Sequence, residues 1–460
     1  MQFPPAFIPS IQNCPGFDRV TFENAHQTPE PVTSIRLNRS KLIAAVLPVA
    51  NELPVSGNVP WCSSGYYLEE RPSFTLDPSF HAGAYYVQEA SSMFLEQALW
   101  QTVDLTAPLK VLDLCAAPGG KSTLIQSLIS KQSVLVANEV IKTRVAVLAE
   151  NITKWGAANV VVTNNDAKDF QHLGAFFDVI VVDAPCSGSG LFRKDPAAVN
   201  EWSEKNVALC SGRQQRILTD VLPALKPGGI LIYATCSYSE EENEAIADWL
   251  CDCFALQSQR LQPDEHWGIV ESISKKHKAY GYRFYPGKVK GEGFFITAFT
   301  NIAAPEPIFK NTSPKKKAEK LSAAELATIT AYLQAPAILR YYRQQEDILA
   351  LPLELADALP LLQQSLYIRK AGIKLGTIIR NELIPHHELA VSTIISKNLP
   401  ALDVDKDTAL QYLRRQDVDL IPGIKGWALL QYQGFSLGWI KFLHNRVNNY
   451  YPKEWRILNR

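Results

Sequence analysis

The sequence lacks the features that mark several classes of protein. No apolar run in its 460 residues approaches the ~18 residues that a helix needs to cross a bilayer. The opening stretch, MQFPPAFIPS, carries two prolines and no basic segment, so no secretory signal is expected there. Eight cysteines are too few for a disulfide scaffold, which favours free thiols in a reducing cytoplasm. Gly 24 and Pro 29 exclude a collagen-like or low-complexity chain.

An excess of charge of either sign is also missing. Lys+Arg 46 against Asp+Glu 46 gives a net charge of zero, which excludes a globally basic nucleic-acid coat but not a local basic patch. Hydrophobic residues make up 47% of the chain and charged residues 20%, as in folded globular proteins rather than disordered ones. At about 150 residues per domain, this length predicts two to four domains.

Composition divides the chain into three folded segments and a linker. Residues 1–105 mix short apolar runs with Pro, Gly and Ser, and residues 106–302 alternate strand-like runs with helical periods. In the predicted linker, 303–320, prolines and the Lys315–Lys317 run replace apolar periodicity. The remaining segment, 321–460, ends in a basic stretch.

The central segment carries the clearest pattern. Strand-length apolar runs occur at 109–114, 133–138, 159–163, 177–184 and 228–236. Helical periods separate them, as in the one-sided series Ile141, Val145, Leu148, Ile152 and Trp155. This alternation predicts an α/β fold, a Rossmann-like doubly wound parallel sheet with helices on both faces. Ligands of such sheets bind at the carboxyl ends of the strands.

A glycine-containing turn follows the first predicted strand. Its residues are Cys115, Ala116, Ala117, Pro118, Gly119, Gly120 and Lys121. Glycines let a ligand approach the backbone, and the following helix offers free N–H groups. The spacing matches neither the Walker loop nor the dinucleotide fingerprint, so by itself the turn can also be a tight strand–helix connection.

Acidic residues end the next two strands. Glu139 can accept hydrogen bonds from both ribose hydroxyls, and Asp166 can take an adenine amino group. Each acid taken alone also fits a helix start or an N-cap. Together with the loop they indicate nucleoside binding, which fits S-adenosylmethionine as well as NAD.

Two cysteines end the fourth and fifth strands. Cys186 follows Asp183-Ala-Pro, and Cys236 follows Ala-Thr, so both thiols can meet in one pocket and become activated there. Cys115, Cys210, Cys251 and Cys253 are interpreted as small buried hydrophobic residues. Cys251-x-Cys253 lacks zinc-site spacing and a second pair, so no metal site is predicted.

These motifs resemble one enzyme family. DLCAAPGGK (113–121), VDAPCSGSG (182–190), RKDP (193–196), LKPGG (225–229), YATCSYSEEENE (233–244) and GEGFF (291–295) are similar, in order, to those of the Nol/Nop/Sun family of RNA cytosine-5 methyltransferases. The similarity covers residues 35–300, with SIRLNRSK (34–41), VPWC (59–62) and 74–93 resembling its N-terminal part. The C-terminal third resembles the small-subunit ribosomal RNA methyltransferase F group, which adds a PUA-like RNA-binding domain.

The resemblance implies a fold, a cofactor and site residues. It implies a small N-terminal α+β domain before the methyltransferase sheet and a β-rich PUA-like region after it. S-adenosyl-L-methionine would be bound by residues 115–121, Glu139, Asp166 and Asp183. The catalytic nucleophile would be Cys236, with Cys186 helping to release the product and Lys121 and Asp183 near the cytosine.

The implied chemistry explains why two thiols are needed. Carbon 5 of cytosine is a poor nucleophile until a thiolate adds at carbon 6. Hydrogen bonding or protonation at ring nitrogen 3, assigned to Asp183, promotes that addition, and elimination with loss of the carbon 5 proton follows. The residues alone leave the two cysteine roles open, because DNA cytosine-5 methyltransferases use a Pro-Cys cysteine, which would select Cys186. The target base must leave its stack, which favours single-stranded or loop RNA.

The C-terminal third holds weaker signals. Residues 372–378 and 434–440 share G-x-x-L-G-x-I, as two related small β modules would. The stretch from Asp403 begins like a calcium loop but has Thr408 and Arg414 at the sixth and twelfth positions, so a helix start is predicted instead. The tail, 439–460, mixes basic and aromatic residues, which suits RNA phosphates and bases.

The leading hypothesis is a cytoplasmic S-adenosylmethionine-dependent RNA cytosine-5 methyltransferase acting on small-subunit (16S) ribosomal RNA or the small ribosomal subunit. The alternatives are the same chemistry on transfer RNA, a ribosome-assembly RNA-binding factor without catalysis, and a methyltransferase of another base or of protein. No membrane or metal partner is expected. The sequence defines neither the modified nucleotide nor the oligomeric state.

Overall fold

The computed structural model describes residues 1–27, 32–42, 53–304, 321–420, 425–444 and 446–458. Within these residues the strands form four sheets, one of ten strands and three of four. Most of the predicted linker, 303–320, including the Lys315–Lys317 run, lies outside the described residues. No helix among the described residues has the length and apolarity to span a membrane.

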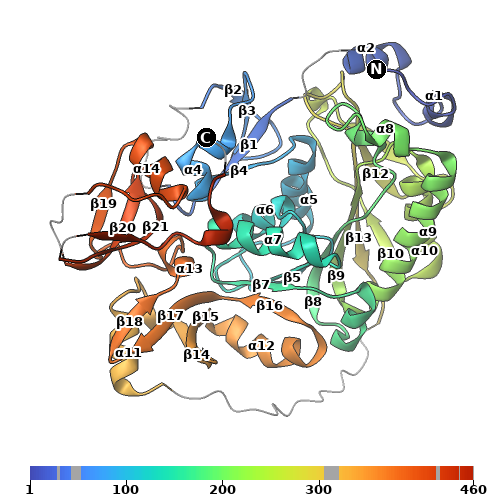
Figure 1. The fold of residues 1–460 in the computed structure, drawn as a ribbon. Helices are drawn as coiled ribbons and strands as arrows, with labels where there is room; N and C mark the ends of the chain where they lie inside the picture. The colour runs from blue at the N-terminus through green and yellow to red at the C-terminus, as the bar shows by residue number, and fades with distance from the viewer. Residues whose placement is uncertain (28–31, 43–52, 305–320, 421–424, 445, 459–460) are drawn as a thin grey trace.

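The ten-stranded sheet is the centre of the molecule (Figure 1). Its parallel part has the order β7-β6-β5-β8-β9, the reversal between β5 and β8 marking the switch point of a doubly wound sheet. The bounds of these strands are β5 (Lys110–Asp113), β6 (Val134–Asn138), β7 (Val160–Thr163), β8 (Phe177–Asp183) and β9 (Leu225–Thr235). All five predicted strands are present, and the predicted Rossmann-like α/β fold is confirmed.

Alternate residues of these strands point to opposite faces, and helices cover both. Val111, Leu135 and Val179 pack on one side, whereas Leu112 and Val136 pack on the other. The first face is covered by α5 (Leu95–Thr102), α6 (Gly120–Leu128) and α7 (Lys142–Trp155). The second is covered by the 3-10 helix η3 (Ala167–Leu173) with η5 (Leu222–Ala224), and by α9 (Glu204–Val221), α10 (Glu244–Cys253) and α12 (Leu353–Ser365).

Antiparallel strands extend the parallel part on both sides. Beyond β9 lie β13 (Phe294–Asn301), β12 (Tyr280–Phe284) and β11 (Val270–Ile273), while β10 (Leu256–Gln259) also pairs with β13. Beyond β7 lies β16 (Ile368–Ala371), which comes from the C-terminal third of the chain. Short elements connect this part: η4 (Ser189–Leu191), α8 (Ala198–Glu201), η6 (Glu240–Glu242) and η7 (Glu265–Trp267).

The N-terminal part is a small α+β unit, as predicted. Its sheet has the order β2-β3-β1-β4. Its elements are α1 (Phe7–Ile11), α2 (Arg19–Gln27), β1 (Ser34–Leu37), β2 (Val55–Asn58), β3 (Gly65–Leu68), η1 (Phe74–Leu76), α4 (Pro78–His81), β4 (Tyr85–Val87) and η2 (Ser91–Phe94).

The C-terminal third forms two further β units. The first comprises α11 (Ala323–Thr330), η8 (Pro336–Ile338), β14 (Leu339–Gln344), β15 (Asp347–Pro352), β17 (Ile373–Ile379), β18 (Glu382–Pro385) and α13 (His387–Ala390). The second comprises β19 (Ala401–Asp403), α14 (Lys406–Leu413), β20 (Gly426–Tyr432), β21 (Phe435–Phe442), β22 (Val447–Asn449) and η9 (Lys453–Trp455). The two G-x-x-L-G-x-I stretches fall on β17 and β21, one in each unit. Asp405 caps α14, in place of a calcium loop.

The second C-terminal unit shares a hydrophobic core with the N-terminal unit. Ile35 and Tyr85 pack in one cluster with Tyr412, Leu430 and Ile440. Figure 1 shows the red C-terminal unit beside α4 and the blue strands β1 to β4, whereas α1 and α2 lie on the other side of the molecule. Residues that the predicted boundaries assign to separate domains therefore share one hydrophobic core.

Candidate active site

The predicted catalytic and cofactor-binding residues follow the carboxyl ends of the parallel strands. The loop 115–121 follows β5, Glu139 follows β6 and Asp166 follows β7. Asp183 ends β8 and Cys236 follows β9. Because parallel strands place their carboxyl ends at one edge, residues from five sections of the sequence meet there.

The loop 115–121 wraps tightly from β5 into α6. Its Ala116 N–H donates to Asn138 O at 2.7 Å, which ties it to the end of the neighbouring strand. Gly119, the N-cap of α6, has φ +118°, a conformation that a residue with a Cβ rarely adopts. The turn thereby leads the chain directly into the first turn of α6, whose N–H groups are unpaired within the helix.

Glu139 is buried beside this loop, and one of its two carboxylate oxygens accepts no hydrogen bond. Its Oε1 accepts the N–H of Ile141 at 2.9 Å, and its Oε2 lies 3.2 Å from the Arg144 guanidinium. That Oε2 is buried and accepts no hydrogen bond. A buried carboxylate next to a glycine turn, with an oxygen that is ion-paired but accepts no hydrogen bond, fits the diol of a ribose. The residues present thus suit a nucleoside cofactor such as S-adenosylmethionine.

The Asp166 carboxylate already has two partners within the protein. It is the N-cap of η3, where its Oδ1 accepts the N–H of Lys168 at 3.2 Å, and the same oxygen lies 3.4 Å from Arg216. The cap and the ion pair therefore use the same oxygen of the Asp166 carboxylate.

Lys121 and Asp183 form an ion pair between α6 and β8. The distance from Lys121 Nζ to Asp183 Oδ2 is 2.7 Å, and the ammonium lies 5.2 Å from the centre of the Phe294 ring. Burial alone would lower the pKa of Lys121, but the Asp183 carboxylate outweighs it, so the net shift is upward. The lysine is therefore a firmly held cation at the strand edge.

Cys186 and Cys236 are in contact at the ends of adjacent strands. Their Sγ atoms are 2.9 Å apart, and neither thiol is fully buried. The hydrogen bond to Cys236, followed by burial, raises the pKa of the Cys186 thiol well above its usual value. This shift favours the protonated Cys186 thiol as the donor in the contact between the two sulfur atoms.

Glu242 is a site residue that the sequence analysis missed. Its Oε1 accepts the Ser187 N–H at 2.9 Å, and its Oε2 accepts the hydroxyls of Ser187 and Ser237 at 2.5 and 2.6 Å. Each serine directly follows one of the two cysteines. The carboxylate is fully buried, and burial raises its pKa. One side chain thus holds together the two loops that carry the thiols.

Asp113 is a second missed residue. It ends β5 with no exposed surface, accepts the Ser122 hydroxyl at 2.6 Å, and its pKa is raised by burial to about 7. Its signal was present, since it is the first residue of the DLCAAPGGK motif. In contrast, Cys251 and Cys253 lie on α10, and Cys253 is exposed, so the prediction that it is buried is wrong. Among the described residues no group of three or more His, Cys, Asp or Glu is placed to hold a metal.

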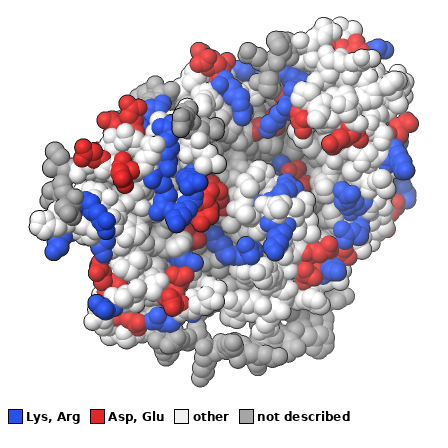
Figure 2. Space-filling model, in the orientation of Figure 1, with Lys and Arg blue, Asp and Glu red and all other residues white. Residues whose placement is uncertain are grey.

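The basic and aromatic tail divides between core and surface. Tyr451 is buried against Tyr412, and Trp439 is buried too, whereas Tyr450 is partly exposed. Lys441 contacts Trp427 and pairs with Glu382. Figure 2 shows acidic and basic side chains interspersed over the visible face, in keeping with the net charge of zero.

Comparisons with known proteins agree with this geometry. The family model "16S rRNA methyltransferase RsmB/F" matches residues 101–300, "N-terminal domain of 16S rRNA methyltransferase RsmF" matches 3–90, and "Methyltransferase RsmF PUA domain" matches 399–457. A relative from Shewanella loihica, named ribosomal RNA small subunit methyltransferase F, is 31% identical over 86% of this chain and 83% of its own length. Its namesake from Vibrio vulnificus is 31% identical over 92% and 90%.

A solved structure shares the fold. A methyltransferase homolog from Pyrococcus horikoshii is 27% identical, with a TM-score of 0.52 over 65% of this chain and 99% of its own. The predicted resemblance, including the PUA-like C-terminal domain, is thereby confirmed. The chain belongs to the 16S rRNA methyltransferase RsmB/F family.

Proposed function

We propose that this protein is an S-adenosylmethionine-dependent methyltransferase that modifies carbon 5 of a cytosine in small-subunit ribosomal RNA. The observation that carries the proposal is the contact between the Cys186 and Cys236 thiols at one strand edge with the Lys121–Asp183 pair. The names of the curated relatives support ribosomal RNA as the substrate.

The chain's own residues would hold the cofactor. S-adenosylmethionine supplies a methyl group on a sulfonium, which an electron-rich carbon can accept. The loop 115–121 offers it backbone and helix N–H groups, and the buried Glu139 offers the ribose an acceptor. Asp166 and Asp183, at the neighbouring strand ends, complete the proposed set.

Cys236 is the proposed nucleophile. Its thiolate would add to carbon 6 of the cytosine and so turn carbon 5 into an enamine carbon that accepts the methyl group. The raised pKa of Cys186 supports this order, because the neighbour that keeps its proton stabilises negative charge on the Cys236 sulfur.

Asp183 and Lys121 would act on the ring of the base. As Cys236 adds, negative charge develops at ring nitrogen 3, and a proton or a strong hydrogen bond there lowers the barrier. Asp183 is proposed to supply the proton from its protonated form, and the Lys121 ammonium, 2.7 Å from its carboxyl group, would stabilise the carboxylate that is left.

Cys186 is the proposed residue for product release. After methyl transfer, carbon 5 carries both a proton and the new methyl group. Elimination would restore the aromatic ring: Cys186 would pass its proton to the leaving Cys236 sulfur, with which it is in contact, and the Cys186 thiolate so formed would accept the carbon 5 proton. The C-terminal PUA domain would help to bind the RNA.

Covalent capture of RNA tests the assignment. We expect Cys186→Ala, mixed with unmodified small-subunit ribosomal RNA and S-adenosylmethionine, to form an adduct that persists on a denaturing gel. Addition at carbon 6 remains possible in this variant while elimination is impaired. Cys236→Ala should form no adduct and transfer no methyl group.

Cys253→Ala is a matched control, because this exposed thiol on α10 lies outside the site and its loss should leave methyl transfer unchanged. An adduct with Cys236→Ala alone would reverse the two roles. Undiminished methyl transfer by Cys236→Ala would contradict the thiol mechanism altogether.

A further inference from the structure

The C-terminal third of the chain reaches the edge of the sheet where the proposed cofactor site lies. Strand β16 pairs antiparallel to β7, with Ile368 opposite Thr163. The residue before it, Tyr367, lies beside the loop that leads from β7 to Asp166 and bonds it twice through its main chain. Its carbonyl accepts the Asn164 N–H at 3.0 Å, and its N–H donates to Asn165 Oδ1 at 3.0 Å.

Asn164 and Asn165 also make hydrogen bonds to the end of β6 and to the residues that follow it. Asn164 Nδ2 donates to the carbonyls of Glu139 and Val140 at 2.7 and 3.0 Å. Asn165, nearly buried, exchanges two hydrogen bonds of 3.0 Å with Asn138 on β6. A short chain of hydrogen bonds therefore runs from Tyr367 to the peptide groups around Glu139.

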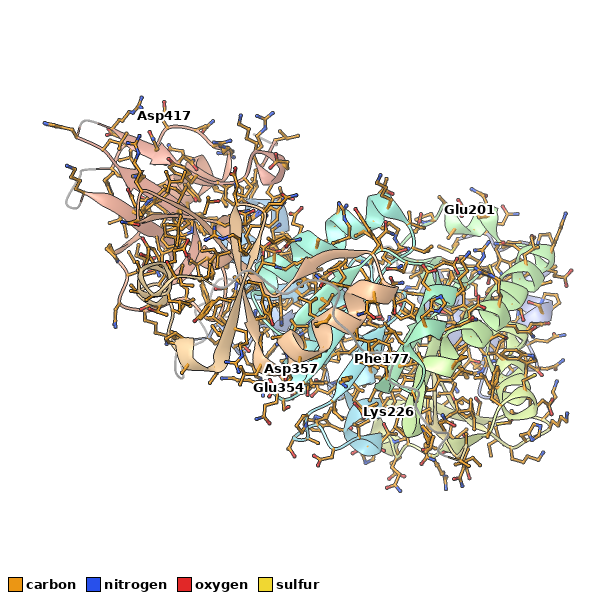
Figure 3. All side chains as sticks on the ribbon, turned by 90° about the horizontal axis from the view of Figure 1, so that it is seen from below. Phe177, Glu201, Lys226, Glu354, Asp357 and Asp417 are labelled. Carbon is orange, nitrogen blue, oxygen red and sulfur yellow. The ribbon has the colours of Figure 1, made fainter. Side chains whose placement is uncertain are left out.

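Packing supports the same connection on the face of the sheet. Helix α12, which directly precedes β16, buries Leu355, Leu359 and Leu362 in the cluster that contains Phe170 and Leu173 of η3. Figure 3 shows α12, marked by Glu354 and Asp357, against the sheet. Asp166 is the N-cap of η3, and Asn165 Nδ2 donates to Asp169 of the same helix at 2.9 Å. The start of η3 is thus held from two sides.

This segment lies between the matched family models. The methyltransferase model ends at residue 300 and the PUA model begins at residue 399, so neither covers α12 or β16. The catalytic sheet is nevertheless incomplete without them, because β7 would otherwise be an edge strand.

We propose that residues 353–371 are part of the cofactor site: through the main chain of Tyr367 and the side chains of Asn164 and Asn165 they position Glu139 and Asp166 for the nucleoside. Asn164 and Asn165 are positioning residues, since they act through the two acids. The inference rests on the proposed function, because it assumes that these acids hold S-adenosylmethionine.

Cofactor binding without RNA tests the inference. Titration calorimetry of the full-length protein with S-adenosylhomocysteine measures the Kd directly. We expect Asn165→Ala to raise that Kd about three- to tenfold, since it loses the bonds to Tyr367 and Asp169. Asn164→Ala, which frees the carbonyls of Glu139 and Val140, should act in the same direction and carries the test if Asn165→Ala does not fold.

Asn449→Ala is the matched control. Asn449 also makes side-chain bonds in two directions, donating to Tyr412 O at 2.9 Å and accepting the Tyr451 N–H at 2.9 Å, but in the second C-terminal unit. Its loss should lower the melting temperature without changing the Kd. A second readout is hydrogen exchange, which should become faster at residues 139–141 and 164–169 in the two test variants.

The outcomes separate this inference from the proposed function. A Kd unchanged in both test variants, or raised equally by Asn449→Ala, overturns the positioning role. Failure of the wild-type protein to bind S-adenosylhomocysteine would instead overturn the proposed function. Tight binding by the wild type with weakened binding by both test variants alone supports the inference.

Discussion

At the scale of single residues, the site depends on a carboxylate that contacts neither thiol. Glu242 accepts hydrogen bonds from Ser187 and Ser237, the residues that follow the two cysteines. The Ser187 and Ser237 hydroxyls also contact each other at 3.3 Å, and the Gly190 N–H donates to Cys236 O at 2.8 Å, but Glu242 is the side chain that bonds both serines. Covalent catalysis is sensitive to such placement, because a shift of ~1 Å can cost about a hundredfold in rate.

We therefore expect Glu242→Gln to slow adduct formation by about ten- to a hundredfold. The amide retains the shape of the carboxylate but has only one oxygen to accept from Ser187 and Ser237. The measurement is the single-turnover rate of RNA capture in a Cys186→Ala background. The exposed neighbour Glu241→Gln supplies the control. Equal rates in the two double variants would show that Glu242 does not position the thiols.

The sequence predicts the positions of some of these site residues but not of others. The positions of Lys121, Asp183 and both cysteines follow from one rule, that parallel strands end at a common edge. Their roles remain proposals. Glu242 could not be chosen from the sequence, because it belongs to a run of three acids, Glu240 to Glu242. Which of the three is buried is determined only when the 3-10 turn forms.

At the scale of elements, close approach between two loops places Cys236. The Gly190 N–H in η4 donates to Cys236 O at 2.8 Å, and the Gly190 carbonyl accepts from the Gly293 N–H at 3.1 Å. A Cβ on Gly190 would lie 2.4 Å from Gly293 O and 2.7 Å from Cys236 O. Real side chains do not approach backbone this closely, so any substitution must separate the strand ends.

Gly190→Ala should destabilise the protein by about 1–3 kcal/mol, the usual cost of overpacking, and abolish most RNA capture by the Cys186→Ala protein. Thermal unfolding and the capture gel measure the two effects. Gly212→Ala is the matched control: its Cβ meets nothing within 4 Å in the middle of α9, and alanine there should add about 0.5–1 kcal/mol. Normal capture by Gly190→Ala would contradict the role assigned to this contact.

Element prediction succeeded where strands are buried on both faces. The runs at β5 to β9 are continuous and apolar, which is the pattern of a covered parallel strand. Strand β16 was not predicted, because its four residues, Ile368–Ala371, include Arg369 and Lys370 and form no apolar run. Its place at the edge is decided by α12 and β7, which lie about 200 residues apart in sequence, and local patterns contain no such information.

At the scale of the whole molecule, the catalytic sheet is built from both sides of the linker. The Arg36 guanidinium of the N-terminal unit donates a hydrogen bond to the Thr123 hydroxyl of α6. The C-terminal third supplies α12 and β16. The N-terminal unit and the second C-terminal unit share a core around Tyr85 and Tyr412. A domain cut out at the boundaries of the sequence pattern would therefore expose surfaces that the intact chain buries.

A protein ending at residue 302 tests this. Removing α12 uncovers the cluster around Phe170 and Leu173, and removing β16 leaves β7 as an open edge. Each large apolar side chain of α12 contributes about 1.5–3 kcal/mol on burial, and α12 buries several of them, whereas ~1 kcal/mol corresponds to about 2–4 °C in a domain of about 150–250 residues. We expect residues 1–302 to melt at least about 10 °C below the intact chain, to bind a hydrophobic dye and to aggregate on warming. Melting curves and sizing chromatography measure these effects, and adding residues 321–460 in trans should partly reverse them. A monomeric 1–302 protein with the melting temperature of the full chain would show instead that the catalytic sheet is complete without the C-terminal third.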